Sequence, residues 1–275
     1  MNSIKAGNRL LDLSSPKIMG IINITPDSFF DGGNYFSEQD ALNRAEKLLA
    51  EGADLLDIGA YSSRPSAAFV SEEEELNRML PIIRALSRAF PEAILSIDTF
   101  RAEVAKQSVG EGAHIINDIS GGSLDERMFE VIAQLQVPYI LMHMRGAPQN
   151  MQEFTAYEDV VQEVNLFFGE RVAALRALGV KDIILDPGFG FSKTLEQNYE
   201  MLRRFEEFHL LELPILGALS RKSMIYNKLR IKPAEALNGT TVLQTVLLQQ
   251  GAKILRVHDV VEAREVITLL SAING

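Results

Sequence analysis

Residues 18–33 read IMGIINITPDSFFDGG and begin with the apolar and β-branched run Ile18 to Ile22. A run of this kind is typical of a parallel strand that is buried on both faces. The strand must end near Pro26, because proline has no backbone N–H to donate to a sheet. Beyond it, the adjacent Phe29 and Phe30 stand in a glycine-ended loop. Paired aromatic side chains are costly to leave in water, so we expect this loop to cover a site.

Strands of the same kind alternate with helical patterns along the rest of the chain. Ser37 can cap a helix that starts near Gln39, and Gly52 is a plausible stop for it. Further strands are expected at 53–60, 93–99, 114–120, 138–144, 181–187, 214–220 and 252–258, with helices between them that include 72–90, 157–178 and 259–273. Eight strand–helix units in 275 residues predict an α/β fold, a (β/α)8 TIM barrel, as a single domain over 1–275 with a short N-terminal extension at 1–16. A doubly wound open sheet is the structural alternative.

Composition narrows the class of protein. The chain is 47% hydrophobic and 23% charged, which is ordinary for a soluble globular protein. It contains no cysteine, so disulfides, thiolate zinc sites and thiol catalysis are excluded. The lack of cysteine is also consistent with a cytosolic location. A net charge of −10, from 37 acidic and 27 basic residues, argues against a nucleic-acid surface but leaves room for a small anion. Without a signal-peptide pattern or a membrane-length apolar run, we expect a cytoplasmic protein with no membrane partner.

Polar residues fall where the predicted strands end, which is the edge at which barrels of this class carry their chemistry. In chain order these strand ends supply Asn23, Asp57, Ser62, Ser63, Asp98, Asn117, Asp118, His143, Asp186, Ser220, Arg221, Lys222, Ser223, Arg256 and His258. One polar strand end is usually a loop cap. Eight in a row predict a polar cavity at this rim.

The two kinds of rim residue suit different parts of a ligand. Asp98, Asn117 and Asp186 offer carboxylates and an amide, which suit a heterocycle with several N–H donors. Lys222, Arg256 and His258 offer cationic or N–H groups, and these follow the last two strands, where phosphate sites are common in such barrels. The pocket is therefore predicted to hold a polar heterocycle at one end and a phosphate at the other.

Other patterns point to structure rather than to chemistry. The DPGFGF stretch at 186–191 lacks the glycine spacing of a dinucleotide fingerprint, and no Walker A loop is present. The four histidines lack metal-ligand spacing, so a zinc site is not expected. The expected roles are structural for His114 and His209, a core residue or part of the site floor for His143, local strand caps for Asp118 and Ser28, and a solvated helix start for Glu72 to Glu75.

Seven segments together resemble one enzyme family. NITPDSFFDGG, DIGAYSSRP, SIDT, IND, LDPGFGF, SRKS and RVHD occur in the order and spacing of bacterial dihydropteroate synthases, and the resemblance runs from Lys17 to the C-terminus. It implies a folate-pathway transferase of an alkyl group and a sulfonamide target. Such an enzyme joins (7,8-dihydropterin-6-yl)methyl diphosphate to 4-aminobenzoate and releases 7,8-dihydropteroate and diphosphate.

The resemblance also implies roles for individual residues. The catalytic set would be Asn23, Asp31, Asp98, Asp186, Lys222, Arg256 and His258. The pterin would be held by Asp98, Asn117, Asp186, Lys222 and Arg256, the diphosphate by Asn23, Arg256 and His258, and Mg²⁺ (magnesium) through Asn23. The 4-aminobenzoate would lie among Phe29, Ser63, Pro65, Phe191, Lys222 and Ser223. Asp31 and Arg64 would order two loops once diphosphate forms, and the family implies a homodimer.

The implied reaction is SN1-like. Mg²⁺, Arg256 and His258 would neutralise charge on the departing diphosphate, while Asp98 and Asp186 could stabilise the cation at the pterin methylene. The arylamine attacks last and is already a competent nucleophile, so no strong general base is expected. Phe29 and Asp31 would ride on a loop that closes over 4-aminobenzoate, whereas Asn23 belongs to the rigid rim.

Departures from the family pattern and two rival interpretations stay open at this point. The departures are Ala60, Tyr61, Ser63 and Ser66 in the second loop, and Ala218 where a glycine usually precedes SRK. One rival is a methyltetrahydrofolate-dependent methyltransferase, which should lack SRKS and the Phe-Phe-Asp loop. The other is a non-catalytic pterin-binding or partner-binding protein, which predicts damage at Asn23, Lys222 or Arg256. All three residues are present.

Overall fold

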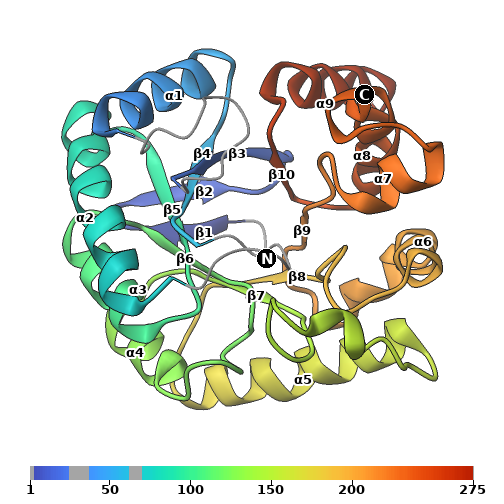
Figure 1. Ribbon diagram of the computed structural model, residues 1–275, viewed down its shortest axis with the longest axis horizontal. Coiled ribbons are helices and arrows are strands. Elements are labelled where there is room, and N and C mark those ends of the chain that lie inside the picture. Colours follow the sequence, from blue (N-terminus) through green and yellow to red (C-terminus); the bar gives the residue numbers. More distant parts are fainter. Residues whose placement is uncertain (1–2, 25–36, 62–69, 275) are drawn as a thin grey trace.

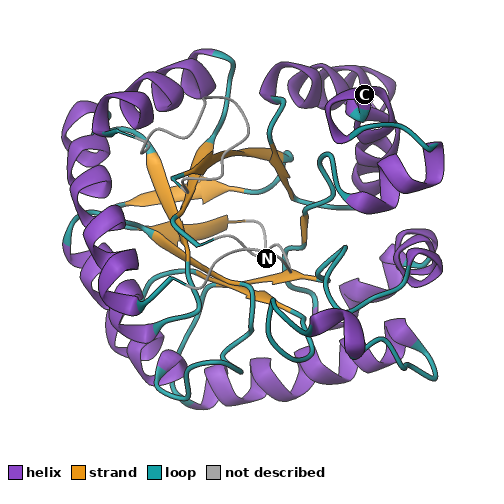
Figure 2. Cartoon of the chain, in the orientation of Figure 1, coloured by secondary structure: helices purple, strands orange, loops and turns teal. Residues whose placement is uncertain are grey.

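The computed structural model describes residues 3–24, 37–61 and 70–274. Parallel strands form its centre, and helices surround them as an outer ring (Figure 1 and Figure 2). Over these ranges the strands are β1 (Ser3–Ala6), β2 (Arg9–Asp12), β3 (Lys17–Asn23), β4 (Leu55–Gly59), β5 (Ile94–Asp98), β6 (Ile115–Asp118), β7 (Tyr139–Met142), β8 (Ile183–Asp186), β9 (Leu216–Gly217) and β10 (Ile254–Val257). None of the helices there has both the length and the apolar character needed to cross a bilayer.

The helices follow the strands in regular alternation. Within the same ranges they are α1 (Glu38–Ala50), α2 (Glu72–Ala89), α3 (Ala102–Gly110), α4 (Met128–Leu135), α5 (Val160–Ala177), α6 (Leu195–Arg203), α7 (Ser223–Leu229), α8 (Leu237–Gln249) and α9 (Val260–Asn274), with short 3₁₀ turns at Met151–Glu153, Phe205–Leu211 and Pro233–Glu235. Ser37 caps α1 as expected, and its side chain and that of Asp40 form a reciprocal capping box.

The larger sheet closes nearly into a barrel. In the described part of the chain its eight strands are ordered β8-β7-β6-β5-β4-β3-β10-β9, with every neighbouring pair parallel. A parallel bridge from Leu185 to Ile215 joins the two edges, where the Leu185 N–H donates to the Pro214 carbonyl at 2.9 Å. The predicted (β/α)8 fold is confirmed, and the doubly wound alternative is wrong because the two edges meet.

The N-terminal extension is a hairpin, which the sequence analysis did not predict. β1 and β2 pair antiparallel from Ser3–Asp12 to Ala6–Arg9. The buried hairpin side chains pack in one cluster with inward residues at the starts of the barrel strands; the cluster comprises Ile4, Ala6, Leu11, Leu13, Met19, Leu55, Ile94, Ile115, Ile140, Ile184, Leu216, Ala218 and Ile254. The hairpin therefore covers the end of the barrel opposite the polar rim and supplies an apolar floor beneath it.

One helix start differs from its prediction. The acidic run at the beginning of α2 was expected to be solvated, yet Glu75 is fully buried. Its carboxylate pairs with the Arg101 guanidinium and accepts a hydrogen bond from Thr99 Oγ1 at 2.7 Å. Burial raises the pKa of Glu75, against the opposing effect of these partners. The prediction is wrong for Glu75, because packing of α2 against the segment after β5 turns that side chain inward.

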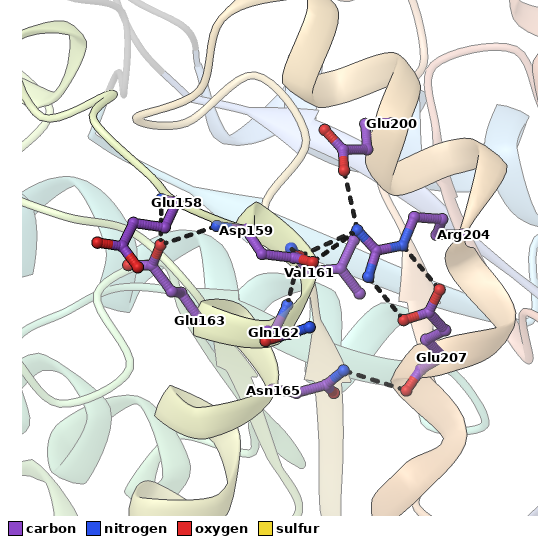
Figure 3. A network of polar contacts seen from close by, with 9 residues as sticks. All are labelled: Glu158, Asp159, Val161, Gln162, Glu163, Asn165, Glu200, Arg204 and Glu207. Carbon is purple, nitrogen blue, oxygen red and sulfur yellow. Dashed lines mark hydrogen bonds and ion pairs between the residues drawn. The ribbon is translucent and has the colours of Figure 1, made fainter.

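Arg204 ties three consecutive elements on the outer ring together (Figure 3). Its Nη1 contacts both Asp159 carboxylate oxygens at 3.0 Å and Glu200 at 2.9 Å, while Nε contacts Glu207 at 2.7 Å. Asp159 in turn caps α5 by accepting hydrogen bonds from two backbone N–H groups at its start. The network thus joins the start of α5 to the end of α6 and to the 3₁₀ turn that follows.

We expect Arg204→Met to lower the free energy of unfolding at pH 7 by about 1–2 kcal/mol, because its ion pairs are only partly shielded from solvent. Hydrogen bonds hold the pKa values of Asp159 and Glu207 below their ordinary range, chiefly from the Gln162 backbone and from Arg204 respectively. Such a contribution is present above the unfolded pKa values and is lost as pH falls through the folded ones. Urea unfolding should therefore show a smaller difference at acid pH. Arg203→Met, an exposed neighbour, is the matched control, and an equal loss in both variants would contradict the prediction.

Candidate active site

A polar layer lies inside the barrel directly above its apolar floor. Side chains two residues apart on a strand share a face, so the inward floor residues are followed by further inward residues. The inward residues that follow Leu55, Ile94, Ile115, Ile184 and Ile254 in this way are Asp57, Ser96, Asn117, Asp186 and Arg256. Of these, Asp57 and Ser96 are fully buried, and Asn117 and Asp186 nearly so. Five strands therefore present polar groups to one interior space.

Arg256 is bonded to two carboxylates of this layer. Its Nε donates to Asp57 Oδ2 at 2.6 Å, and its Nη2 donates to Asp98 Oδ2 at 2.8 Å. Ser96 Oγ and Asn117 Nδ2 also donate to Asp57, at 2.6 and 3.1 Å. Although burial acts to lower it, these two carboxylates raise the pKa of Arg256 above its ordinary value. The guanidinium is a fixed positive charge whose position Asp57 sets.

Three acceptors stand close to this guanidinium. Burial raises the pKa of Asp98 to about 7, against the lowering effect of Arg256. Burial also raises the pKa of Asp186, against Lys222, while Asp186 Oδ1 accepts a hydrogen bond from the Gly188 N–H at 2.8 Å. Among the described residues, the buried Asn117 Oδ1 has no hydrogen-bond partner. A buried acceptor without a partner is costly, so this wall of the cavity suits a ligand that donates N–H groups.

Lys222 lies where the polar layer meets an aromatic surface. Its Nζ donates to the Phe189 carbonyl at 2.6 Å and lies 4.7 Å from the centroid of the Phe191 ring. Burial lowers the pKa of Lys222 to about 8, although Asp186 acts to raise it. Phe191 packs in an apolar cluster with residues of β7 and its neighbours. Ser223 begins α7 immediately after Lys222, so three of the predicted 4-aminobenzoate residues come together here.

Ser220 contacts both the backbone and the ring of His258. Its Oγ accepts from the His258 backbone N–H at 3.2 Å and lies 3.1 Å from His258 Nδ1. The hydroxyl can donate to Nδ1, and the neutral imidazole tautomer that accepts this bond carries its proton on Nε2. Burial, followed by the charge of Arg256, lowers the pKa of His258 to about 4. His258 is accordingly neutral at pH 7, so of the two roles that the sequence left open for it, cation or N–H donor, the structure favours the N–H donor.

Ser220→Ala should raise KM for the pterin diphosphate about tenfold and change KM for 4-aminobenzoate far less, because only the first substrate would meet His258. Without the hydroxyl, the imidazole is free to place its proton on Nδ1, which removes the donor at Nε2. Steady-state kinetics with each substrate varied in turn measure the difference. Ser271→Ala, on the exposed face of α9, is the control. Equal changes in both KM values would contradict the assignment.

The remaining predicted residues divide between the rim and undescribed segments. Asn23 ends β3, is exposed, and pairs in register with Gly59. Phe29, Asp31, Ser63, Arg64 and Pro65 lie outside the described residues, as do Ser28, Ser62 and Ser66, and so does the loop that was predicted to close.

The histidines without an assigned catalytic role make structural contacts. His114 Nδ1 accepts from the Leu95 N–H at 3.1 Å, and His209 Nε2 lies 2.9 Å from the Gln250 carbonyl, so both have the structural roles expected for them. His143 is almost fully buried, its Nδ1 lies 3.0 Å from Lys193 Nζ and its ring packs edge-on against Phe167, so it is a core residue. The described residues contain no cluster of three or more His, Cys, Asp or Glu that could hold a metal ion.

Comparison with known proteins decides the family. A model of the family described as pterin binding enzyme matches residues 19–258. Dihydropteroate synthase of Escherichia coli strain K12 is 46% identical over 264 residues, which cover 95% of this chain and 93% of that protein. The chain belongs to the dihydropteroate synthase family. The synthase of Haemophilus influenzae is 42% identical over 270 residues, covering 97% of each chain.

Solved structures of dihydropteroate synthases agree with this placement. The Yersinia pestis enzyme in a sulfonamide drug complex superposes with a TM-score of 0.94 at 42% identity, covering 99% of both chains. The Xanthomonas albilineans enzyme with 4-aminobenzoic acid gives 0.93 at 38% identity, covering 100% of this chain and 98% of that one. The chain is therefore an enzyme of the alkyl-transferring synthase class, and the rival interpretations are set aside.

Three residues that depart from the usual dihydropteroate synthase pattern, Ala60, Tyr61 and Ala218, lie in the described part of the chain. Ala60 is buried in the outer core between strands and helices, so its methyl does not enter the cavity. Ala218 stands two residues after Leu216, so it lies at the level of the polar layer while it packs against the apolar floor cluster. The Tyr61 ring meets Phe100 edge-on at 5.1 Å, and its hydroxyl accepts a hydrogen bond from Gln149.

Several functional contacts were missed by the sequence analysis. Asp57 was noted as a strand end but given no role, although it is the closest partner of Arg256. Its signal was its place two residues after Leu55 on the inward face of β4. Ser220 is likewise a polar strand end in the sequence, and Lys193 carries no such signal; the neighbours through which each acts are supplied only by the folded chain.

Proposed function

We propose that this chain catalyses the condensation of (7,8-dihydropterin-6-yl)methyl diphosphate with 4-aminobenzoate to 7,8-dihydropteroate and diphosphate. The observation that carries the proposal is the buried polar layer, which sets one unpartnered amide oxygen and two carboxyl groups beside the Arg256 and Lys222 side chains. A pterin diphosphate has this polarity, with N–H donors on the ring and negative charge on the leaving group. The relatives named as dihydropteroate synthases support the same reaction.

The pterin would occupy the wall formed by Asp98, Asn117 and Asp186. The unpartnered Asn117 Oδ1 would accept from a ring N–H, and the two carboxyl groups would accept from the others. Lys222 would approach from the segment that follows β9, at the same rim, and the Arg256 guanidinium would lie against the ring face. These groups recognise donors and acceptors on one heterocycle, so exchanging it for a purine of different polarity should cost affinity.

The diphosphate would lie at the rim beside Asn23, Arg256 and His258. The donor set fits Mg²⁺, because this ion commonly takes only one or two protein oxygens and completes its shell with phosphate oxygens and water. Asn23 offers one exposed amide oxygen, and the described residues hold no carboxylate cluster that would form a closed metal cage. When bound through Asn23, Mg²⁺ would supply positive charge to the phosphate oxygens.

The chemical step would be SN1-like. The bond from the methylene carbon to the phosphate oxygen breaks, and its electron pair leaves with diphosphate. Arg256 and the His258 Nε2–H would stabilise the charge on that oxygen. The carboxylates of Asp98 and Asp186 would stabilise the cation spread over the pterin. The arylamine nitrogen then bonds to the methylene carbon and loses a proton to solvent.

The 4-aminobenzoate would lie against Phe191, with Lys222 and Ser223 toward its carboxylate. The remaining wall would come from Phe29, Ser63 and Pro65, with Asp31 and Arg64 ordering the loops. The Xanthomonas relative is described with 4-aminobenzoic acid and the Yersinia relative with a sulfonamide, and we propose that this pocket takes both kinds of ligand. A sulfonamide should therefore compete with 4-aminobenzoate here.

Incubation of the purified protein with pterin diphosphate, labelled 4-aminobenzoate and Mg²⁺ tests the proposal. Labelled dihydropteroate should form together with an equal amount of diphosphate. No product while the pterin diphosphate stays intact would overturn the assignment.

We further propose one domain over 1–275, since hairpin and barrel share the floor cluster. A homodimer and a cytoplasmic location stay predictions, to be checked by light scattering and by fractionation of cells.

A further inference from the structure

Lys193 is a buried amine outside the proposed set of substrate-binding residues. Only 3% of its surface is exposed. Its Nζ lies 3.1 Å from the Gly188 carbonyl, 3.0 Å from the Phe191 carbonyl and 3.0 Å from His143 Nδ1, with the His143 carbonyl at 3.4 Å. Carbonyl oxygens only accept hydrogen bonds, so the amine is the donor to each of them. Lys193 thereby ties the segment 187–194, here named the β8–α6 loop, to the end of β7.

The β8–α6 loop contacts two groups of the active site through its backbone. The Gly188 N–H donates to Asp186 Oδ1 at 2.8 Å, and the Phe189 carbonyl accepts from Lys222 Nζ at 2.6 Å. The loop also carries the Phe191 ring, which lies against the Lys222 amine. Lys193 therefore binds the Gly188 and Phe191 carbonyls, which stand on either side of the Phe189 carbonyl that binds Lys222.

The fit between this loop and β7 leaves little space. Gly188 has φ +72°, and a Cβ added there would lie 2.2 Å from the His143 carbonyl. At the other side, Gly190 N–H donates to Asn198 Oδ1 at 2.6 Å. Because these contacts hold the loop at the residues just before Lys193, the amine sits at a fixed point and not on a freely moving chain.

We propose that Lys193 is a positioning residue for the synthase reaction: it holds the β8–α6 loop so that Phe189 and Phe191 set the place of the Lys222 amine. The inference rests on the proposed function, because it assigns Lys222 and Phe191 to the substrates. Burial lowers the pKa of the Lys193 amine well below its ordinary value, so the role assigned to it rests on the hydrogen bonds that it donates to the Gly188 and Phe191 carbonyls.

Lys193→Met tests the positioning role through a difference between substrates. KM for 4-aminobenzoate should rise about tenfold or more, because small displacements of a positioning group are costly. The Kd of the pterin diphosphate should change less than about threefold, since its acceptors belong to barrel strands and Lys222 keeps its attraction to Asp186. Lys106→Met, an exposed lysine on α3, is the control. An unchanged KM for 4-aminobenzoate overturns the proposal.

The absence of cysteine from the chain allows a sharper test. In Lys193→Cys the thiol is unique and can be alkylated in denaturant before refolding. Reaction with 2-bromoethylamine restores an amine of nearly the same reach, whereas iodoacetamide gives a neutral side chain of similar size. The amine adduct should return KM for 4-aminobenzoate to within about threefold of that of refolded unaltered protein, and the neutral adduct should not.

Other outcomes each have a definite meaning. Equal KM values for the two adducts, both folded by thermal unfolding, assign the effect to volume and overturn the proposal. Failure of both Lys193 variants to fold assigns Lys193 to the fold alone and also overturns it. Turnover by the refolded unaltered protein reports on the proposed reaction separately, so the two failures are distinguishable.

Discussion

Arg256→Met should lower kcat/KM for the pterin diphosphate about a thousandfold, because it removes the fixed charge that, on the proposed mechanism, would face the departing phosphate oxygen. The same change should lower the free energy of unfolding by about 3–5 kcal/mol at pH 7, since it leaves two buried carboxylates without their cation. Asp57 is fully buried, and the guanidinium lies 2.6 Å from it and 2.8 Å from Asp98.

The pH dependence distinguishes this mechanism from a general loss of packing. Burial already raises the pKa of Asp98 to about 7, and without Arg256 that pKa should rise further. Protonation then relieves the unpaired charge, so the loss of stability should shrink as pH falls from 7 to 5. Urea unfolding of both proteins at pH 7 and at pH 5 measures this change in the loss of stability. Arg256→Lys, which keeps one charge but cannot bond both carboxylates, should lie between the two proteins. A pH-independent loss would contradict the prediction.

Lys222→Met should abolish turnover and weaken binding of the pterin substrate about a hundredfold. The amine is buried between Asp186 and the Phe191 ring, so its loss removes a charged donor from a site with little solvent to replace it. Calorimetric titration of the pterin diphosphate in the absence of 4-aminobenzoate measures the effect. Lys228→Met changes an exposed lysine on the same short helix and should leave binding unaltered.

The unaltered protein offers an independent check on Lys222. Because the pKa of Lys222 is lowered to about 8, its charge is present below that pH and is lost above it. Pterin affinity should therefore fall as pH rises through 8, and Lys222→Met should lose this alkaline limb. Retained pterin binding by Lys222→Met would remove the residue from its proposed role.

The strand series and its polar rim were predictable because both depend on local pattern. Apolar runs of four to seven residues are typical of parallel strands buried on both faces, and β3 to β8 and β10 follow such runs. Parallel strands share a direction, so polar residues at their C-terminal ends meet at one rim. Asn117, Asp186 and Arg256 were predicted to lie together for this reason, and the structure places them in one layer.

The hairpin and the buried acid were not predictable from the same rules. Ile4 and Leu11 belong to short strands that cover the barrel floor. No local sequence pattern predicts the apolar surface on which these strands pack. Glu75 has the composition of a solvated helix start, yet Arg101, which follows the next strand, reaches it. In both cases the contact that decides burial comes from another part of the chain.

The sequence alone determined the eight strand–helix units, the rim on which the chemistry falls and the family to which those motifs belong. Periodicity and composition act over a few residues, so folding does not alter them. The tertiary structure alone decided which distant groups meet: Asp57 with Arg256, 199 residues apart, and Ser220 with His258. It also decided that Lys193 is buried. Closure of the barrel excludes water from these groups, and the positions and charge states that follow depend on contacts between distant strands.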